Sequence, residues 1–423
     1  MYWAYSFILF LSLLYYIPAY FIKLRIRKGE SLYFKQRFGI KLPVRSTAGP
    51  SVWIHAVSVG EVLSLQNLIN SFKERNPDWT VYISVLTNSG FKIASEKLSG
   101  ISGVFFIPFD FTLIIKRFFK TLKPDLFILA ESEFWPNLLK VAKKNCTAVF
   151  LVNGRISERS FRRYSRMKIF IKKILGKIDF FLVQTEREKN GLIDLGILPK
   201  KIFQVGNLKA DVQLPMLSTE KIDRLKDQLG IPEGKKVILA GSTHRGEEIQ
   251  ILQAFSEAKK VYHDEVMMIA PRHPERAGEI EKFCKDLSLS YIRKSRDVFE
   301  TGWDVLIIDT LGELAVLYSL CDLAFIGGSL VEWGGQNFLE PAFYSKPIFF
   351  GPYMDNFRDI AEIFVRSQAA SIVKNKSELN QVFLFQDKEF FVLMGKNARS
   401  TLMSLQGATE KTLTLIERYT KQQ

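Results

Sequence analysis

Two short acidic motifs in the first half of the chain carry side chains that suit acid–base chemistry. The first, SVGE, ends at Glu61 and links an apolar, strand-like run to a stretch with helical periodicity. A carboxylate at that place can take a proton from a hydroxyl group. A Glu in the first turn of a helix is also favoured by the helix dipole alone. The motif therefore predicts either a general base or an ordinary helix start.

The second acidic motif, ESEFWPN, occupies residues 131–137 and again follows a strand-like run. Glu131 and Glu133 alternate along an extended segment, so only one of the two carboxylates need face a ligand. Pro136 suits the first position of the helix that follows. A catalytic carboxylate and plain helix capping are both consistent with this pattern.

Small and hydroxylated residues at a third strand-to-helix junction suit an anionic ligand. The run GSTHRGEE places Ser242, Thr243 and His244 after an apolar run and before a helical one. Exposed backbone amides at a helix start can hold a phosphate. The run matches neither the GxGxxG nor the GxxxxGK[ST] pattern, so a phosphate loop is predicted here from position alone.

Two further junctions offer groups that can bind an anion. In PRHP, residues 271–274, Arg272 is held between two prolines, and a guanidinium can bind a phosphate or carboxylate through two parallel hydrogen bonds. Gly312 and Glu313 open another helix, where backbone amides can meet a negative charge. Both junctions favour an acidic ligand in the second half of the chain.

Glycine pairs and a polar helix start follow the next strand-like run, in FIGGSLVEWGGQNFLEP. Paired glycines allow the backbone to approach a ligand closely. Asn337 suits an N-cap with Glu340 three positions into the helix, which would be a plain capping box. In the functional alternative, Glu340 accepts hydrogen bonds from ribose hydroxyls, as acids do in nucleotide sites.

Several catalytic and metal-binding patterns are absent from the sequence. The four histidines form neither HExxH nor HxH, and there is no DxD pair and no GxSxG. The three cysteines are too few and too scattered for a disulfide framework or a CxxC metal site. These absences disfavour serine hydrolases and metal-dependent enzymes, and no metal or other cofactor is expected.

The elements that must position these motifs read as alternating strands and helices. Expected strands cover Val52–Val57, Val81–Leu86, Leu126–Ala130, Ala148–Val152, Phe180–Gln184, Val237–Ala240, Val266–Ala270, Val305–Asp309, Leu323–Ile326 and Pro347–Phe350. Helical patterns lie between them, such as Glu61–Arg75, Ser157–Leu175, Glu247–Tyr262 and Pro274–Leu287. The alternation predicts an α/β protein with parallel sheets, helices on both faces and ligands at the carboxyl ends of the strands.

The length of 423 residues favours two domains over one. The run DVQLPMLST, residues 211–219, reads as a linker between two Rossmann-like, doubly wound domains with a ligand cleft between them. We therefore expect domains over residues 23–210 and 220–405. A C-terminal helix over residues 406–423 is expected to cross back to the N-terminal domain.

The net charge of +15 belongs to one part of the chain. Up to Leu208 there are 32 Lys and Arg against 14 Asp and Glu, or +18, and the remainder has 27 against 30, or −3. Eight basic residues lie in the segment Lys23–Arg45 and nine in Arg155–Lys177. One basic run is often only a solvated helix face, but two such runs favour an anionic surface or substrate over nucleic acid.

Residues 1–22 contain no charged side chain. As a helix they would span about 30 Å, the thickness of a bilayer core. Basic residues follow this segment, whereas a signal peptide has them in front. The pattern predicts a single-pass transmembrane anchor with everything after it in the cytoplasm. The alternative is a helix that lies in the membrane interface or docks on the protein.

Taken in order along the chain, these motifs resemble the 3-deoxy-D-manno-octulosonic acid (Kdo) transferases of Gram-negative bacteria, which act on the lipid A precursor. The resemblance rests on RFG at residues 37–39, HAVSVGE, ESEFWPN, NGRISERS, GNLK, GSTHRGEE, PRHPER, DTLGEL, FIGGSLVEWGGQNFLEP and FGPYMDNF. It implies the two-domain glycosyltransferase B fold, with the sugar nucleotide held by the C-terminal domain. Gly154 and Gln336 depart from the Ala and His found at these places in other members.

The resemblance also implies roles for individual residues. The catalytic base falls on Glu61, and the groups that stabilise the transition state fall on Glu131 and Lys209. A juxtamembrane acid, Glu30, is a lesser catalytic candidate. Contacts to a CMP-sugar fall on Pro271, Arg272, Leu311, Gly312, Glu313, Asn337, Phe338, Leu339 and Glu340. The phosphate loop over Ser242, Thr243 and His244 stays an expectation from its position before a helix.

The implied reaction moves Kdo from CMP-Kdo to the 6′-hydroxyl of the tetraacylated lipid A precursor, lipid IVA, with inversion and release of CMP. The expected partners are CMP-Kdo, the lipid A precursor and anionic lipids of the inner membrane, with no nucleic acid. Two rivals stay open. One is another enzyme on the same fold, such as a lipid A disaccharide synthase or a nucleotide-sugar epimerase, and the other is a non-catalytic membrane-surface binding protein.

Overall fold

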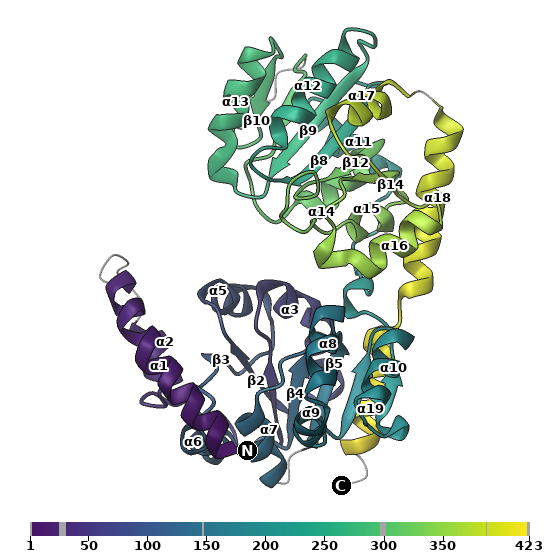
Figure 1. Cartoon of the computed structure of the whole chain (residues 1–423). Helices are drawn as coiled ribbons and strands as arrows, with labels where there is room; N and C mark the ends of the chain where they lie inside the picture. The colour runs from purple at the N-terminus through teal and green to yellow at the C-terminus, as the bar shows by residue number, and fades with distance from the viewer. Residues whose placement is uncertain (1, 25–30, 146–147, 297–301, 386, 421–423) are drawn as a thin grey trace. The chain divides into compact units, whose positions relative to one another are not determined.

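The computed structural model describes residues 2–24, 31–145, 148–296, 302–385 and 387–420. It divides into two compact units, each built around its own sheet (Figure 1). The N-terminal unit comprises Met1–Asp211 with Gln406–Gln423, and the C-terminal unit comprises Val212–Leu405. Each unit is described below by itself.

The N-terminal unit contains a seven-stranded parallel sheet in the order β3-β2-β1-β4-β5-β6-β7. Its central strands are buried on both faces, as expected for a parallel sheet between helical layers. The strands are β1 (Ser51–His55), β2 (Thr80–Val85), β3 (Gly103–Phe106), β4 (Leu126–Ala130), β5 (Ala148–Gly154), β6 (Phe180–Val183) and β7 (Ile202–Gln204).

Helices cover both faces of this sheet, because successive strand residues point to opposite sides. Trp53 packs into the core on one face, and Val52 and Ile54 into the core on the other. The first face is covered by α6 (Thr112–Leu122), α7 (Pro136–Lys144), α9 (Lys168–Leu175) and α10 (Glu186–Asp194), and the second by α3 (Val59–Ser64), α4 (Gln66–Arg75), α5 (Asn88–Lys97) and α19 (Ala408–Thr420). The unit also contains α1 (Tyr2–Leu24), α2 (Ser31–Arg37), α8 (Glu158–Arg166) and the 3₁₀ turns Pro199–Lys201 and Leu208–Ala210.

The C-terminal helix α19 belongs to the N-terminal unit. The Asp211 carboxylate fixes its start, because it accepts hydrogen bonds from the backbone amides of Gly407 at 2.6 Å and Thr409 at 2.5 Å. Tyr419, near its end, packs edge-on against Phe150 and Phe180. The last helix is therefore part of the core that supports the first sheet.

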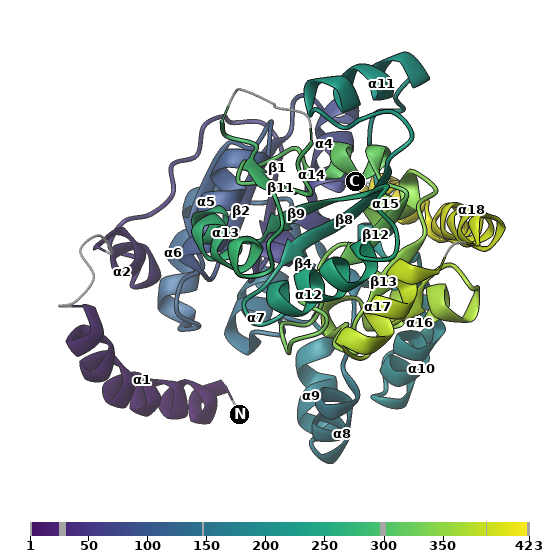
Figure 2. The same cartoon turned by 90° about the horizontal axis from the view of Figure 1, so that it is seen from above.

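The C-terminal unit contains a second seven-stranded parallel sheet, in the order β10-β11-β9-β8-β12-β13-β14 (Figure 2). The strands are β8 (Lys236–Thr243), β9 (Glu265–Pro271), β10 (Tyr291–Arg293), β11 (Val305–Ile307), β12 (Leu323–Ile326), β13 (Ile348–Phe350) and β14 (Ser371–Ile372). The helices are α11 (Thr219–Gln228), α12 (Glu248–Lys259), α13 (Ala277–Asp286), α14 (Leu314–Leu317), α15 (Leu339–Phe343), α16 (Arg358–Arg366), α17 (Lys376–Leu384) and α18 (Lys388–Leu405), with 3₁₀ turns at Pro274–Arg276, Tyr318–Leu320 and Asp355–Phe357.

The fold class expected from the sequence is confirmed, since both units are α/β with parallel, doubly wound sheets. Each of the ten expected strands overlaps an observed one, and the four strands not expected (β3, β7, β10 and β14) are the outer strands of the two sheets. Two helices expected as continuous are interrupted, at Leu65 between α3 and α4 and at Met167 between α8 and α9.

The expected transmembrane anchor corresponds to α1, which begins at Tyr2 and ends at Leu24. Within the described part of the chain, no helix combines the length and the apolar character needed to cross a membrane. The expectation of a membrane-spanning segment over residues 1–22 is therefore not supported. Glu30, the lesser catalytic candidate, lies outside the described residues.

Candidate functional site

The two acidic motifs of the N-terminal unit meet where the strand order reverses. Glu61 follows β1 and Glu131 follows β4, and these two strands pair directly at the centre of the sheet. Strands are added in one direction up to β3 and in the other direction from β4 onward. In open α/β sheets this switch point, at the carboxyl ends of the strands, is where ligands bind.

Glu61 is fixed by hydrogen bonds at the start of α3. Its carboxylate accepts a hydrogen bond from the Val57 backbone amide at 2.8 Å and one from the Ser58 hydroxyl at 3.1 Å. The Ser58 oxygen in turn accepts from the Glu61 backbone amide at 3.3 Å, so the two side chains cap the start of α3 as in a capping box, with the Val57 amide in place of the N-cap amide. Burial raises the pKa of Glu61 to about 7, with Glu131 and Glu133 adding to the rise and the hydrogen bonds opposing it. A carboxylate with that pKa is well matched to proton transfer near neutral pH.

The segment that carries Glu131 and Glu133 has an unusual backbone. The backbone of Glu131 lies at φ +55°, in the left-handed region that residues other than glycine seldom adopt. Strain of this kind is found most often at functional sites. The indole of Trp135 donates a hydrogen bond to the Glu133 carboxylate at 3.0 Å. Burial nevertheless raises the pKa of Glu133, and the nearby Glu131 charge adds to the rise.

Lys209 comes from the 3₁₀ turn after β7, and polar side chains at or just after the ends of β5, β6 and β7 hold this turn. The Asn207 side chain accepts from the Lys209 backbone amide at 2.9 Å and donates to Gln184 at 2.9 Å. Asn153, itself in the left-handed region at φ +53°, accepts from the Leu208 backbone amide at 3.0 Å. These contacts fix the backbone of the turn and hence the origin of the Lys209 side chain.

The three residues expected to be catalytic lie within electrostatic reach of one another. Burial lowers the pKa of Lys209, while the charges of Glu131 and Glu61 oppose that change and Arg155 adds to it. The structure thus brings together two carboxylates and an ammonium group from three strand ends. Their individual catalytic roles stay predictions.

A cavity of about 450 Å³ lies beside the acidic segment. Glu133, Trp135, Arg163, Tyr164 and Tyr5 are among its lining residues, so its walls combine aromatic rings with a carboxylate and a guanidinium. Such a mixture of apolar walls and a few placed polar groups is typical of small-molecule sites.

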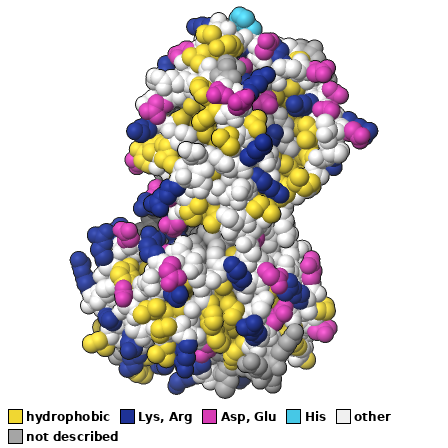
Figure 3. Space-filling view, turned by 90° about the vertical axis from the view of Figure 1, so that its right-hand side faces the viewer, with side chains coloured by type: hydrophobic (Ala, Val, Ile, Leu, Met, Phe, Trp, Pro, Cys, Tyr) yellow, Lys and Arg dark blue, Asp and Glu magenta, His cyan; other side chains and the backbone are white. Residues whose placement is uncertain are grey.

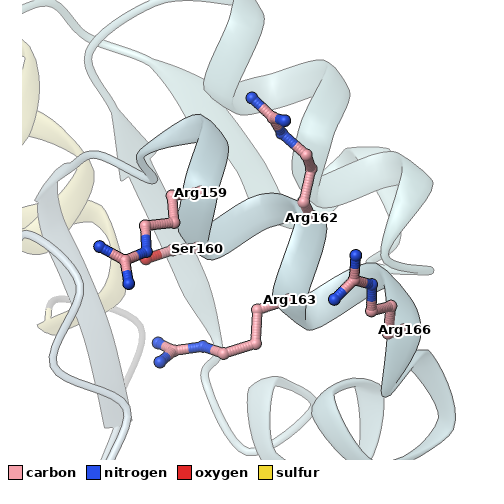
Figure 4. Close-up of a pocket in the computed structure, with 5 residues that line it drawn as sticks. All are labelled: Arg159, Ser160, Arg162, Arg163 and Arg166. Carbon is pink, nitrogen blue, oxygen red and sulfur yellow. The ribbon is translucent and has the colours of Figure 1, made fainter.

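A second hollow, of about 780 Å³, lies over α8 and is lined by Arg159, Ser160, Arg162, Arg163 and Arg166 (Figure 4). Figure 4 shows Arg159 and Arg163 extending to the same side of the helix, which their i, i+4 spacing requires. Ser160 and Arg163 also line the cavity beside Glu133, so the two hollows are neighbours. Like charges at this spacing destabilise a helix by about 0.2–0.5 kcal/mol a pair, a cost that a bound anion would offset.

The motifs of the C-terminal unit also gather at a switch point, between β8 and β12. Glu247, which is fully buried, ties the loops that follow these strands, because its carboxylate accepts from the backbone amides of His244 at 2.7 Å and Gly328 at 2.5 Å. Burial raises the pKa of Glu247 to about 7, and these hydrogen bonds oppose the rise. Gly327 packs so close to Ser242 that a β-carbon would lie 2.4 Å from the Ser242 carbonyl oxygen.

The expected phosphate loop leads into an aromatic stack. His244 stacks on Trp333, with ring centroids 4.8 Å apart, and its Nε2 lies 3.1 Å from Nε2 of Gln336. Burial lowers the pKa of His244 to about 4, with His273 and Arg272 adding to the effect. His244 is therefore neutral at pH 7. Ser242 lies in the left-handed region at φ +55°, and Thr243 is fully buried.

Most of the other expected donor contacts lie around the same loops. The Arg272 backbone amide donates to the Thr243 carbonyl at 2.9 Å while its side chain is exposed, and Pro271 ends β9. In the DTLGEL loop, Leu311 and Gly312 are exposed, and the Glu313 carboxylate pairs with Lys294 at 2.8 Å.

The segment Asn337–Glu340 leads into α15, and its polar and apolar side chains differ in their surroundings. The Asn337 side chain accepts from the Leu339 backbone amide at 3.1 Å and donates to the Glu340 carboxylate at 3.0 Å. Burial raises the pKa of Glu340 to about 7. Phe338 and Leu339 are fully buried, with Phe338 packed against other aromatic rings. Any donor contact from Phe338 or Leu339 is therefore restricted to their backbone.

Comparison with known proteins gives the family. A family model described as 3-deoxy-D-manno-octulosonic-acid transferase (kdotransferase) matches residues 33–212. A second model, CDP-glycerol:poly(glycerophosphate) glycerophosphotransferase, matches residues 171–309. A 3-deoxy-D-manno-octulosonic acid transferase from Rickettsia bellii is 36% identical over 377 residues, which cover 89% of this chain and 88% of the relative. The chain belongs to the Kdo transferase family.

Other similar proteins set this Kdo transferase family member in context. A bifunctional glycosyltransferase/methyltransferase of Fusobacterium nucleatum is 37% identical over 332 residues, 77% of this chain, and the match spans 51% of that longer relative. The crystal structure of a glycosyltransferase from Rickettsia africae covers 89% of this chain and 100% of its own with a TM-score of 0.58 at 14% identity. That likeness shows the shared two-unit fold, as expected for the glycosyltransferase B type.

Sequence reasoning missed several residues that support the candidate site of this Kdo transferase family member. Asn153 and Asn207 lie in the NGRISERS and GNLK motifs, but their hydrogen bonds depend on loops brought together by the sheet. Lys294 lies in no motif and pairs with Glu313 only because β10 and β11 are neighbours. In the sequence these residues are marked only as polar residues in or near a motif. Polar residues are so common near motifs that this feature does not identify the ones that support the site.

Proposed function

We propose that this member of the family transfers Kdo from CMP-Kdo to the 6′-hydroxyl of a tetraacylated lipid A precursor, with inversion and release of CMP. The observation that carries the proposal is the Glu61 site, in which a buried carboxylate with a pKa of about 7 lies within electrostatic reach of Glu131 and Lys209. Membership of the family supports Kdo as the transferred sugar. The site contains groups suited to moving one proton and to stabilising developing charge.

In the proposed reaction, Glu61 accepts the proton of the acceptor hydroxyl as its oxygen attacks the anomeric C2 of Kdo. The bond between C2 and the phosphate oxygen breaks, and CMP leaves with both electrons of that bond. Lys209 and Glu131 stabilise charge on the reacting sugar. A partly buried ammonium group such as that of Lys209 stabilises negative charge more strongly than a fully exposed one, because water screens it less.

The donor is proposed to bind at the switch point of the C-terminal unit. This unit has a slight negative balance, so placed groups must hold an anionic nucleotide: the exposed Arg272 guanidinium and the amides that follow β8 and β12. Glu340 is proposed to accept hydrogen bonds from the ribose. The match to a model named for a CDP-glycerol enzyme supports a cytidine nucleotide.

The acceptor is proposed to bind in the N-terminal unit, with an acceptor phosphate on the α8 arginines and its sugar in the cavity beside Glu133. On the face drawn in Figure 3, basic and acidic side chains are interspersed over both units and form no continuous basic patch. The arginines over α8 are in contrast concentrated on one short helix. Their forked donors match phosphate oxygens in pairs.

The protein is further proposed to work at the cytoplasmic surface of the inner membrane, in contact with anionic lipids. This proposal rests on the apolar face of α1, where Trp3, Phe7, Phe10 and Leu14 are exposed. Apolar side chains of this kind, next to basic residues, suit a helix that lies in the headgroup region. Flotation with vesicles containing anionic phospholipid tests it, and a protein that stays at the bottom of the gradient contradicts it.

A donor panel separates the proposal from its rivals. The purified full chain is incubated with a lipid A precursor and, in turn, CMP-Kdo, UDP-N-acetylglucosamine, a UDP-linked acylated glucosamine and CDP-glycerol. The proposal expects acceptor-dependent nucleotide release from CMP-Kdo alone. Epimerisation or use of a UDP-sugar would assign the protein to another enzyme of this fold, and binding of lipid with no turnover would indicate a membrane-surface binding protein.

A further inference from the structure

Polar side chains at the beginning of α1 contact the rest of the N-terminal unit. The Asn137 side-chain amide donates to the Ser6 hydroxyl at 3.0 Å, and the Tyr5 hydroxyl lies close enough to the Asp110 carboxylate to lower the pKa of that carboxylate. The Lys140 ammonium group lies 4.5 Å from the centre of the Tyr2 ring. Tyr2, Tyr5 and Ser6 have the i, i+3, i+4 spacing of one helix face. The beginning of α1 lies beside α7 (Figure 1).

Asn137 is the junction of this contact, and its bonds are all made inside the protein. It is fully buried, as is Asp110 apart from 1% of its surface. Its side-chain amide also donates to the Asp110 carbonyl at 2.6 Å, and its side-chain oxygen accepts from the Thr112 hydroxyl at 3.1 Å. A buried polar group left without a hydrogen-bond partner destabilises the fold around it. Removal of Ser6 or Tyr5 would therefore affect the residues around Asn137.

The same residues fix the start of α7, which follows the acidic segment directly. The Asp110 carboxylate accepts from the backbone amides of Asn137 at 3.0 Å and Leu138 at 2.8 Å, and so caps the helix. Only Trp135 and Pro136 separate this cap from Phe134 and Glu133. Tyr5 also lines the cavity that contains Glu133 and Trp135. A shift of the cap would move the segment that bears Glu131 and Glu133.

The opposite side of α1 makes no such contacts among the described residues. Trp3, Phe7, Phe10 and Leu14 are 89%, 62%, 50% and 55% exposed, and their spacing places them on a separate face. The helix thus has a polar, docked face and an apolar, exposed face. Substitutions can address the two faces separately.

We propose that α1 is a positioning element of the acidic site: Tyr5 and Ser6, acting through Asp110 and Asn137, hold the start of α7 and thereby the segment Glu131–Trp135. This role is separate from any part that α1 plays at a membrane. The effect on turnover rests on the function proposed above, whereas the effect on the segment itself does not.

The test compares Tyr5→Phe/Ser6→Ala with Trp3→Ala/Phe7→Ala, which changes the exposed face of the same helix. Hydrogen exchange of the full chain is followed in peptides covering residues 131–140. Loss of the Ser6–Asn137 hydrogen bond and of the Tyr5–Asp110 interaction should speed exchange at Asn137 and Leu138 about tenfold. Kdo transfer to a detergent-solubilised acceptor should lose about tenfold in kcat with little change in the donor KM. The single variant Ser6→Thr keeps the hydroxyl and leaves Tyr5 unchanged. Its exchange rates at residues 137–138 and its kcat should lie within a few-fold of the wild-type values.

The control pair should leave exchange at residues 137–138 unchanged. Unchanged exchange at residues 137–138 in the Tyr5/Ser6 double variant would overturn the proposal, as would an equal effect of the two pairs. If wild-type protein transfers no Kdo, the proposed function fails, but the exchange comparison still decides whether α1 positions the segment. A single variant, Ser6→Ala, covers the case in which the double variant does not fold.

Discussion

Ser58 and Glu61 hold each other at the start of α3: the Ser58 hydroxyl donates to the Glu61 carboxylate at 3.1 Å and accepts from the Glu61 backbone amide at 3.3 Å. The Glu61 carboxylate therefore both caps α3 and serves as the proposed general base. The two interpretations that the SVGE motif permits are therefore compatible. Capping fixes the direction of the carboxylate before any acceptor binds, and preorganisation of this kind favours proton transfer.

Replacing Glu61 with Gln should lower kcat by about a hundredfold or more, because general-base catalysis contributes about 10²–10⁴. Gln keeps the volume and can still cap the helix, so CMP affinity should not change. Initial rates and CMP binding measure the two effects. Turnover within threefold of wild type would mean that another group is the base.

The pH dependence follows from the pKa of about 7 for Glu61 in the ligand-free protein. Only the ionised carboxylate accepts a proton, so wild-type kcat/KM should rise from pH 6 to pH 8 with a midpoint near 7. Ser58→Ala removes a hydrogen bond that favours the ionised form, so the midpoint should move to higher pH. A rate that falls over this range would contradict the assignment.

The same pKa predicts that the stability of the wild-type protein falls with rising pH, over the range in which its activity rises. Folding raises the pKa of Glu61 from 4.5 to about 7, so the fold favours the protonated form, and that stabilisation is lost as pH rises through 7. Between pH 5 and pH 8 the free energy of unfolding of Glu61→Gln should gain about 2 kcal/mol relative to wild type. Denaturant unfolding at the two pH values measures the difference, and no change would place Glu61 in a solvated environment.

Lys209→Met should lower kcat by about a hundredfold, the loss typical when one charge-stabilising group is removed. The Lys209 and Glu61 charges stabilise each other, so the variant should also move the midpoint of the pH profile upward. Lys201→Met, at a Lys whose ammonium group donates to the Ile178 carbonyl, is a matched control. A midpoint that stays in place would show that Lys209 and Glu61 are not coupled.

Arg159→Ala/Arg163→Ala should raise the KM of the acceptor about tenfold or more, since hydrogen bonds to charged groups contribute about 1.5–3 kcal/mol each. A dephosphorylated acceptor should show no such difference between variant and wild type. Lys168→Ala/Lys173→Ala, at exposed residues of the neighbouring helix α9, removes equal charge outside the hollow and should have the smaller effect. Equal effects of the two pairs would indicate general attraction by charge instead of a phosphate site.

The central strands could be predicted from the sequence because burial on both faces demands continuous apolar runs such as Phe127–Leu129. The outer strands could not, since β10 and β14 are short and partly exposed. The break at Met167 was equally hidden, because α8 and α9 share one helical periodicity. The strand ends that carry Glu61, Glu131 and Arg272 followed from the alternation of strands and helices.

The supporting contacts of the site depend on folding and left little trace in the sequence. Glu247 reads as an ordinary helix residue, yet its burial and its bonds to two loops make it a connection between β8 and β12. Phe338 reads as part of a donor motif, whereas its side chain packs in the core. Asn137 reads as the end of a motif, although its partner Ser6 lies 131 positions away along the chain.

Incubation of the purified full chain with CMP-Kdo and lipid IVA, followed by mass spectrometry of the lipid, tests the proposed reaction most directly. We expect CMP release and a lipid heavier by one or more Kdo residues with wild-type protein, and unchanged lipid with Glu61→Gln. Unmodified lipid IVA after incubation with folded wild-type protein, or the same product from Glu61→Gln at the wild-type rate, would contradict the account.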